Sequence, residues 1–274
     1  MIQAHNLTYY YNSNRILNNI DLDLHPGQLV SLLGRNGEGK STLFKILTGD
    51  YRAQNGEVLY NGVNVLGMNR KELARIRSVL PQDSTINFPL RVFEIIEMGR
   101  APYGKNHSNL TLYANRSMEL TDIKHLRNRF YSDLSGGEKQ RVQIARALCQ
   151  LDKEAILLEK NRSKDSNLCS LKGYLFLDEP VNSLDILLQH KIMKILRHLA
   201  DVGFMVFCIL HDWNLAGLYS DRILILQNGQ LVHNGLPQEV LDQNNLESNF
   251  NILANVYPHG NKFVGGYTRG LSTR

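Results

Sequence analysis

The sequence predicts an α/β fold in which a mostly parallel sheet is flanked by helices. Several short, almost wholly apolar runs end in polar residues, which is typical of parallel strands covered on both faces. A glycine-rich segment separates one of these runs from a helical pattern, as in strand–loop–helix units. The chain has 274 residues, of which 43% are hydrophobic and 21% charged, so it is large enough for the core that this fold requires.

The first predicted elements are two strands and a helix. Residues 20–24 alternate apolar and polar side chains, as a half-buried strand does, and His25-Pro26-Gly27 ends the run. Residues 29–33 are nearly all apolar and predict a buried parallel strand. After a glycine-rich loop, residues 42–47 predict a helix with Gly49 at its C-terminal cap.

Two more buried strands are predicted late in the chain, over residues 174–177 and 205–210. Asp178-Glu179 follows the first and His211-Asp212 the second, and ligands of open parallel sheets bind at the carboxyl ends of the strands. The middle of the chain is helical, and we interpret it as a subdomain inserted into the α/β core. Its helical patterns cover residues 92–98, 110–120 and 138–148.

The composition argues against several classes of protein. The formal net charge of +5 is spread along the chain rather than collected in blocks, so we expect no nucleic acid partner. Three distant cysteines fit neither a disulfide scaffold nor a zinc site. The N-terminus carries no signal pattern, and the longest apolar run, 204–210, is far shorter than the ~20 residues of a membrane helix. We therefore expect a cytosolic chain that reaches a membrane only through a partner.

A phosphate-binding loop, or P-loop, is predicted at Gly34-Arg35-Asn36-Gly37-Glu38-Gly39-Lys40-Ser41, between a strand and a helix. Glycines let backbone N–H groups approach phosphates, and a helix N-terminus favours negative charge. Lys40 can reach the β- and γ-phosphates, and the Ser41 hydroxyl can bind Mg²⁺. Glu38 is unusual beside phosphates, and we expect its side chain to face solvent. The predicted ATP-binding residues of this segment are Gly34, Asn36, Gly37, Gly39, Lys40, Ser41 and Thr42.

The acidic pair Asp178-Glu179 follows a predicted buried strand. A carboxylate at a strand end beside a P-loop is placed to hold Mg²⁺, directly or through water, and Asp178 has this position. Glu179 can polarise an attacking water, which predicts hydrolysis of the nucleotide rather than binding alone. These residues leave several classes of nucleotide-hydrolysing protein open.

A second glycine turn at a predicted helix start separates these classes. The segment Leu134-Ser135-Gly136-Gly137-Glu138-Lys139-Gln140-Arg141 resembles the signature motif of ABC ATPases. Its serine hydroxyl and backbone N–H groups form a second anion site. One chain then holds two phosphate-binding loops, and bringing both to one ATP requires a second copy. The resemblance implies a head-to-tail homodimer that sandwiches two ATP molecules, with Ser135, Gly136, Gly137 and Glu138 acting in trans.

The resemblance to ABC ATPases covers nearly the whole chain and implies further site residues. Gln82 resembles the glutamine that links the Mg²⁺ site to the helical subdomain, and His211 resembles the switch histidine that contacts the γ-phosphate. Asp185 resembles the aspartate of the loop that crosses the dimer. The implied catalytic residues are Glu179, His211, Lys40 and Gln82, and the implied Mg²⁺ ligands are Ser41, Gln82 and Asp178.

The family also has an aromatic residue that stacks on adenine. Tyr11 fits this residue by its distance from the predicted strand over 17–20, with Tyr9 and Tyr10 as close rivals. The residue pattern does not decide among the three tyrosines.

In architecture, the resemblance implies a P-loop NTPase core with an N-terminal antiparallel β subdomain and an inserted α-helical subdomain. Residues 152–172, rich in Lys, Glu, Asn and Ser, read as an exposed inserted loop of unassigned role. The implied single ABC ATPase domain over 1–274 comprises 1–81 and 174–240 as the core with the β subdomain, 82–150 as the helical subdomain, the loop over 152–172, and 241–274 as a C-terminal extension.

Residues 92–104 and 211–216 are similar to the ATPases of iron-siderophore, cobalamin and haem uptake systems. The resemblance implies a peripheral subunit on the cytoplasmic face of the bacterial inner membrane. It would work below a permease dimer, which residues 88–103 would contact, and indirectly with a periplasmic substrate-binding protein. Haem is the implied cargo, not a ligand of this chain, and ferric siderophores or cobalamin are the alternatives. A soluble ABC ATPase without a permease and a non-catalytic nucleotide-binding scaffold are alternatives from other classes.

Overall fold

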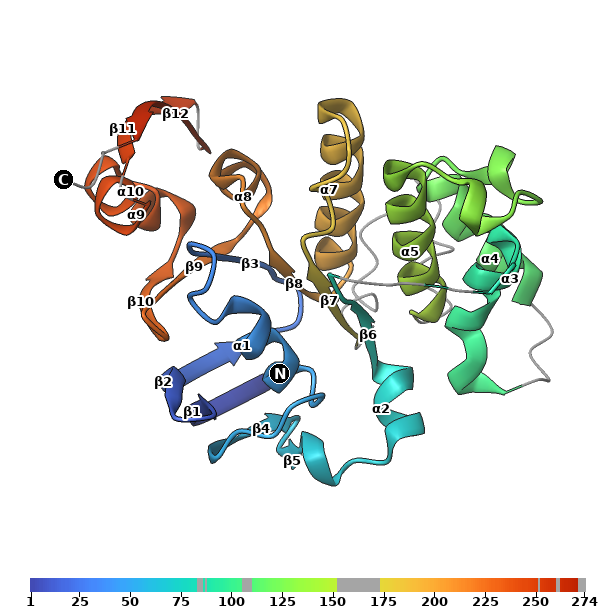
Figure 1. The fold of residues 1–274 in the computed structure, drawn as a ribbon, viewed down its shortest axis with the longest axis horizontal. Coiled ribbons are helices and arrows are strands. Elements are labelled where there is room, and N and C mark those ends of the chain that lie inside the picture. Colours follow the sequence, from blue (N-terminus) through green and yellow to red (C-terminus); the bar gives the residue numbers. More distant parts are fainter. Residues whose placement is uncertain are drawn as a thin grey trace. The chain divides into compact units, whose positions relative to one another are not determined.

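The computed structural model describes residues 1–82, 86, 88–104, 110–151 and 173–250, together with the backbone of 252–259 and 262–270. The predicted loop over 152–172 lies outside the described residues. The chain forms two compact units, which are described separately below (Figure 1). Unit 1 comprises Met1–Gly67 and Phe207–Arg274, and unit 2 comprises Met68–Val206.

Unit 1 contains a four-stranded antiparallel sheet near the N-terminus. Its strand order is β2-β1-β4-β5, and alternate side chains of β1 and β2 are buried on one face. The predicted strand over 20–24 is the end of the longer strand β2. The strands are β1 (Ile2–Tyr11), β2 (Asn14–Leu24), β4 (Asn55–Tyr60) and β5 (Val63–Asn64). They form the predicted N-terminal antiparallel β subdomain.

The second sheet of unit 1 has the strand order β10-β9-β3-β8. All five residues of β3 are buried, and β3 pairs in parallel with β9. A short turn at Asn228-Gly229, with positive φ at both residues, joins β9 to the antiparallel β10. The boundary between the two units falls inside β8. The strands are β3 (Leu29–Leu33), β8 (Met205–Ile209), β9 (Arg222–Gln227) and β10 (Gln230–Gly235).

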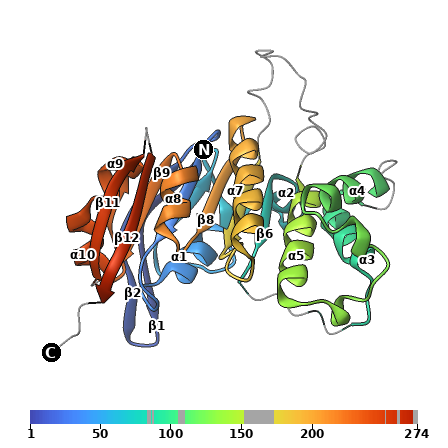
Figure 2. The ribbon, with the colours of Figure 1, turned by 90° about the horizontal axis from the view of Figure 1, so that it is seen from above.

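Helices and a terminal hairpin complete unit 1. Helix α1 follows β3, and Gly49, with φ 73, takes the left-handed conformation just beyond its end, as predicted. The short turn η1 follows β5, and the remaining elements, which follow β8 and β10 along the chain, are labelled in Figure 2. The elements are α1 (Lys40–Leu47), the 3₁₀ turn η1 (Val65–Gly67), α8 (Trp213–Tyr219), α9 (Pro237–Val240), α10 (Gln243–Phe250), β11 (Ile252–His259) and β12 (Lys262–Gly270).

The strands of unit 2 have the order β8-β7-β6. Strands β6 and β7 pair in parallel, with Leu80 opposite Leu177. All five residues of β7 are buried, as the apolar run predicts. The predicted parallel α/β core is thereby confirmed. The elements around these strands are β6 (Arg77–Leu80), β7 (Tyr174–Asp178), α2 (Arg70–Ile76) and α7 (Ile186–Asp201).

The helical part of unit 2 has a core of its own, formed by side chains such as Val92, Tyr113, Met118 and Val142. The predicted helix over 92–98 ends one residue early. The chain continues as the 3₁₀ segment η2. The backbone of Gly99 packs tightly against Arg146 O, and Pro102 follows within the segment. The elements are α3 (Val92–Glu97), η2 (Met98–Tyr103), α4 (Leu110–Leu120), η3 (Lys124–Leu126), η4 (Tyr131–Asp133) and α5 (Gly136–Gln150).

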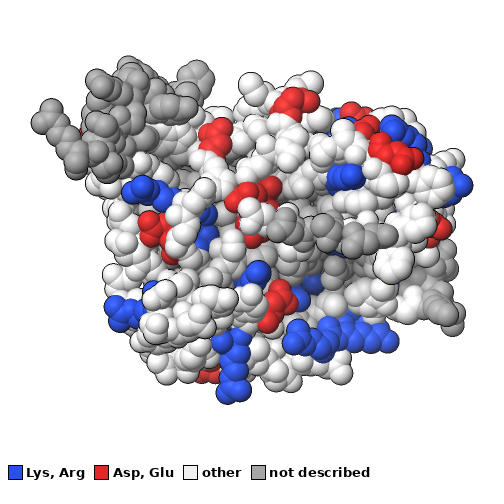
Figure 3. Space-filling model, in the orientation of Figure 1, with Lys and Arg blue, Asp and Glu red and all other residues white. Residues whose placement is uncertain are grey.

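Two features of the described structure concern possible partners: the length and polarity of its helices, and the distribution of charge on its surface. Within the described ranges, none of the helices combines the length and apolar character that crossing a bilayer requires. On the face drawn in Figure 3, basic and acidic side chains both occur and are dispersed. This dispersion agrees with the spread of charged residues along the sequence.

Candidate functional site

The predicted P-loop of unit 1 lies between the buried strand β3 and helix α1. Gly34 and Gly39 have φ of 151° and 98°, a region that residues with a side chain rarely adopt. A Cβ at Gly34 would collide with Leu226 O, and one at Gly39 would lie 3.0 Å from Ile16 O. Backbone oxygens of β9 and β2 therefore lie so close to the loop that only glycine fits at these two positions.

Lys40, the first residue of α1, has its ammonium group enclosed by this loop. Its side chain is only 6% exposed, and Nζ donates hydrogen bonds to Gly34 O and Arg35 O, each at 2.8 Å. Among the described residues, no side chain caps the N-terminus of α1, where Ser41 and Thr42 occupy the first turn. The loop thus wraps around an ammonium group beside a helix N-terminus, an arrangement suited to a phosphate group.

Glu38 differs from the expectation that its side chain faces solvent. The side chain is half-exposed, and its carboxylate accepts a hydrogen bond from the backbone N–H of Asn228. Asn228 begins the turn between β9 and β10, and its positive φ of 47° presents the N–H to the P-loop. The negative charge of Glu38 is therefore held by a backbone donor from another element.

The structure distinguishes the three tyrosines at the end of β1. The ring of Tyr9 stacks on the ring of Tyr51, with centroids 5.9 Å apart, so one face of Tyr9 is already covered. The N–H of Tyr10 donates to Gln54 Oε1 at 3.0 Å, and its side chain is 38% exposed. Tyr11 is 65% exposed. Its exposure makes Tyr11 the most accessible of the three for stacking, and the assignment to adenine stays a prediction.

His211 belongs to the same unit as the P-loop. The N–H of Leu210 donates to Leu32 O at 3.2 Å, so the end of β8 lies beside the end of β3. His211 follows directly and is exposed, and β3 leads into Gly34. The structure thus brings the histidine close to the strand end from which the P-loop starts.

Three predicted site residues lie at the carboxyl ends of β6 and β7 in unit 2. Asp178 ends β7 and is 3% exposed. Glu179 follows with φ of 53°, a left-handed conformation that is uncommon for a residue with a side chain and is often found at functional sites. Gln82 is exposed and follows Leu80, which pairs with Leu177. The parallel register therefore places Gln82 at the same sheet end as the acidic pair.

The signature segment of unit 2 starts helix α5 with a capping box. Ser135 N–H and Oγ–H both donate to Glu138 Oε2, at 2.8 and 2.9 Å, and Glu138 N–H donates to Ser135 Oγ at 3.3 Å. The bond from the Ser135 backbone lowers the pKa of the Glu138 carboxyl. Gly136 is exposed, and a Cβ there would meet no atom within 4 Å in the described part of the chain.

Asp185 caps the N-terminus of α7 by accepting a hydrogen bond from Leu188 N–H at 2.9 Å. The loop before it packs on the signature, since a Cβ at Gly137 would lie 3.0 Å from Ser183 O. The signature and the predicted dimer-crossing loop are therefore neighbours within unit 2.

Two contacts near Glu179 were not predicted from the sequence. Gln140 Nε2 donates to Glu179 O at 3.3 Å and to Pro180 O at 3.1 Å, which ties the signature helix to the turn after β7. Asn182 Nδ2 donates to the carboxylate of Glu179. Gln140 belongs to the signature segment and Asn182 follows Glu179 by three residues, but neither position signals these contacts in the sequence.

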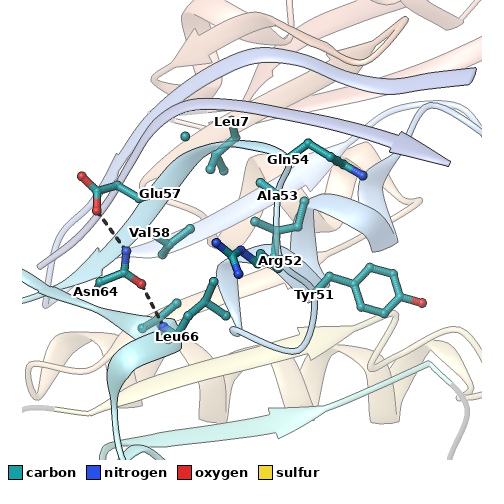
Figure 4. A pocket seen from close by; sticks show the side chains of 12 residues that line it. Leu7, Tyr51, Arg52, Ala53, Gln54, Glu57, Val58, Asn64 and Leu66 are labelled. Carbon is teal, nitrogen blue, oxygen red and sulfur yellow. Dashed lines mark hydrogen bonds between the residues drawn. The ribbon is translucent and has the colours of Figure 1, made fainter. Parts of the chain in front are cut away.

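A separate pocket in unit 1, of about 130 Å³, is shown in Figure 4. Ile46 from the last turn of α1 and Arg52 from the following segment contribute to its lining, and Glu57 bonds to Asn64 Nδ2 at 3.0 Å at its edge. The P-loop lies at the other end of α1. None of the predicted site residues lines this pocket.

Known proteins similar to this chain identify its family. The family described as ABC transporter matches residues 17–159. The chain is 39% identical to the hemin import ATP-binding protein HmuV of Mesorhizobium japonicum, over 95% of this chain and 96% of the relative. It is 38% identical to the protein of the same name from Aliivibrio fischeri, over 94% of this chain and 90% of the relative.

Solved structures agree in fold. A dimeric bacterial ABC transporter cassette superposes with a TM-score of 0.73 at 25% identity, covering 86% of this chain and 99% of the cassette. The likeness extends over both units, so each has a counterpart in a complete cassette.

Proposed function

The chain belongs to the ABC transporter family, whose ATPase domain binds nucleotide, and from this premise we propose that it is the ATP-hydrolysing subunit of a haem importer. One observation carries the proposal. A single chain has two glycine-containing turns at helix starts, one before α1 in unit 1 and one before α5 in unit 2, and each is suited to a phosphate. The similarity to hemin import ATP-binding proteins supports haem as the cargo.

ATP binding falls to the P-loop residues. Backbone N–H groups at the start of α1 would receive the phosphates, and the buried Lys40 ammonium would exchange carbonyl partners for phosphate oxygens. The exposed ring of Tyr11 would stack on adenine. Asn36 and Gly37 are exposed in the loop, where the backbone is accessible to a ligand.

Mg²⁺ would be held by the Ser41 hydroxyl, the Gln82 amide oxygen and the Asp178 carboxylate, because each supplies the hard oxygen ligand that this ion prefers. When bound, Mg²⁺ would neutralise charge on the β- and γ-phosphates. Asp178 ends the wholly buried strand β7 and is itself 3% exposed, which supports this role.

Hydrolysis needs a group that orients water and groups that stabilise the developing charge. Glu179 would orient the water, and its carboxylate is held by Asn182 Nδ2. Lys40 and His211 would stabilise charge on the transferred phosphoryl group. This division of roles follows the family resemblance.

A second copy would complete the site. The signature residues of one copy, at the exposed start of α5, would face the γ-phosphate held by the P-loop of the other copy. Asp185 would approach the partner at the same interface. The dimeric cassette of similar fold supports this assembly.

Coupling to transport would pass through the helical part of unit 2. We assign the core to 1–81 and 174–240 and the helical subdomain to 82–150, with Gln82 at the junction. The segment over 88–103 would receive a permease dimer. The chain would then lie on the cytoplasmic face of the membrane, with a periplasmic binding protein delivering haem to the permease and no haem bound by this chain.

The proposal predicts haem-dependent ATP hydrolysis. In proteoliposomes that contain this chain, its permease and its binding protein, haem is expected to raise the hydrolysis rate several-fold. A ferric siderophore and cobalamin at the same concentration are expected to leave the rate at its basal level. Phosphate release is the measurement, and vesicles with the Glu179→Gln chain are the control for contaminating ATPases.

Stimulation by the siderophore or by cobalamin alone would overturn haem as the cargo and keep the importer role. Fast hydrolysis by the isolated chain that no ligand and no permease changes would contradict the importer role itself. That result would favour an ABC ATPase that acts without a permease.

A further inference from the structure

Arg100 is a buried cation at the C-terminal end of the signature helix α5. Its side chain is 3% exposed, and Nη1 donates to Cys149 O at 3.2 Å and to Leu151 O at 2.9 Å. The guanidinium lies 3.7 Å from the ring centroid of Tyr103 and 4.6 Å from that of Tyr113. Among the described residues no carboxylate pairs with it. The negative end of the helix dipole and two aromatic rings therefore hold this charge.

The last turn of α5 is also joined to β6 and η2. Ser78 Oγ donates to Ala147 O at 2.8 Å, and Gln150 Nε2 donates to Arg77 O at 2.9 Å. The hydroxyl of Tyr103 lies 3.0 Å from Gln150 O, within hydrogen-bond distance. These bonds tie the end of the signature helix to the strand that leads to Gln82 and to the segment over 98–103.

We propose that Arg100 is a positioning residue for ATP hydrolysis, which fixes the end of α5 to η2 and thereby aims the signature toward the nucleotide of a second copy. The inference rests on the proposed function. Helix α5 is a single element of 15 residues with the signature at its first turn and Arg100 at its last. A tilt of the fixed end would displace Ser135 and Gly136 at the other end.

Packing alone does not account for this arrangement. Val142, Ala145 and Cys149 are the residues of α5 that lie in the apolar core of the helical part. An apolar side chain at position 100 would keep that packing and lose two charge-assisted hydrogen bonds to the helix end. The helix would stay folded, and its orientation would be less well defined.

ATP-dependent dimerisation in a Glu179→Gln background tests the proposal, because this variant retains ATP. Light scattering after size exclusion measures the ATP concentration for half-dimerisation. Arg100→Met is expected to raise this concentration about tenfold, from the loss of hydrogen bonds to a charged group. The affinity of the monomer for a fluorescent ATP analogue is expected to stay unchanged, since the P-loop is in unit 1. Arg100→Lys should restore much of the dimerisation, because an ammonium can reach the same two carbonyls.

Arg75→Met is the matched control. The Arg75 guanidinium lies 5.9 Å from the same Tyr103 ring, but its Nε donates to Pro102 O, and within the described structure no hydrogen bond joins its side chain to α5. Should circular dichroism show that Arg100→Met is unfolded, Arg100→Gln replaces it. Equal ATP dependence of a folded Arg100 variant and its parent would overturn the positioning role. A Glu179→Gln parent that binds ATP without dimerising would overturn the proposed function, and this inference with it.

Discussion

The Glu179→Gln variant is expected to bind ATP and hydrolyse it about 10²–10⁴ times more slowly, because a positioned general base contributes a factor of this size. Glutamine has the same shape, and its amide oxygen can accept the bond that Asn182 Nδ2 donates to Glu179. The left-handed backbone at Glu179, with φ of 53°, imposes the same cost on both residues. The variant should therefore fold normally and lose only the step that needs the carboxylate. Steady-state phosphate release and equilibrium ATP binding measure the two effects.

Glu57→Gln is a suitable control for this variant. It makes the same chemical change at an exposed carboxylate of β4, which bonds to Asn64 away from the P-loop. Its hydrolysis rate should equal that of the wild type. Hydrolysis by Glu179→Gln within a few-fold of the wild-type rate would remove Glu179 from the catalytic role and leave the binding residues unaffected.

Lys40→Ala is expected to lower kcat/KM for ATP by about 10²–10³, the typical loss for one preorganised group that stabilises developing charge. The substitution also removes the two bonds, to Gly34 O and Arg35 O, that hold the loop together. Binding of ATP should weaken along with hydrolysis, in contrast to Glu179→Gln. Isothermal titration with ATP, followed by a hydrolysis assay, separates the two contributions.

Lys40→Met controls for the loss of volume at this buried site, because methionine fills most of the space without the charge. Both variants are expected to be equally inactive. An active Lys40→Met chain would show that packing of the loop, and not the ammonium, is what the site requires.

Local patterns in the sequence were sufficient for the core and the phosphate-binding loop. The apolar runs of β3 and β7 are wholly buried strands, because a parallel strand covered on both faces has no polar side. The glycines of the P-loop are explained by φ values and close contacts that only glycine tolerates at Gly34 and Gly39. Each of these features is encoded in a short stretch of residues.

Contacts between distant segments could not be predicted in the same way. The carboxylate of Glu38 accepts a hydrogen bond from the N–H of Asn228, which is far away in the sequence. This bond forms only because the turn between β9 and β10 lies beside the loop. The Asn228-Gly229 pair predicts a turn, but it does not predict which segment of the chain that turn lies against. Arg100 gave no sequence signal as a cation at a helix end, because its partners are backbone carbonyls, which every residue carries.

The choice among Tyr9, Tyr10 and Tyr11 was also beyond the sequence. All three are aromatic and adjacent, and they are separated by the packing of Tyr9 on Tyr51 and by the different exposure of Tyr10 and Tyr11. The exposure of the Tyr11 ring now favours it, and the role in adenine binding remains a prediction.

Two inactive variants can be combined to test whether each ATP site is shared between two copies. Lys40→Ala disables the P-loop. Gly136→Asp places a carboxylate at the signature, where a Cβ meets no atom within 4 Å in the described part of its own chain, so the fold should tolerate it. Each variant alone should be inactive, the second because the added charge repels the γ-phosphate.

Hydrolysis by an equimolar mixture of the two chains is the decisive measurement. A shared site predicts recovery to about a quarter of the wild-type rate, since half of the dimers carry one intact site out of two. That site joins the P-loop of the Gly136→Asp chain to the signature of the Lys40→Ala chain. A mixture as inactive as its components would contradict the shared site, and with it the proposal that two copies of this chain hydrolyse ATP together.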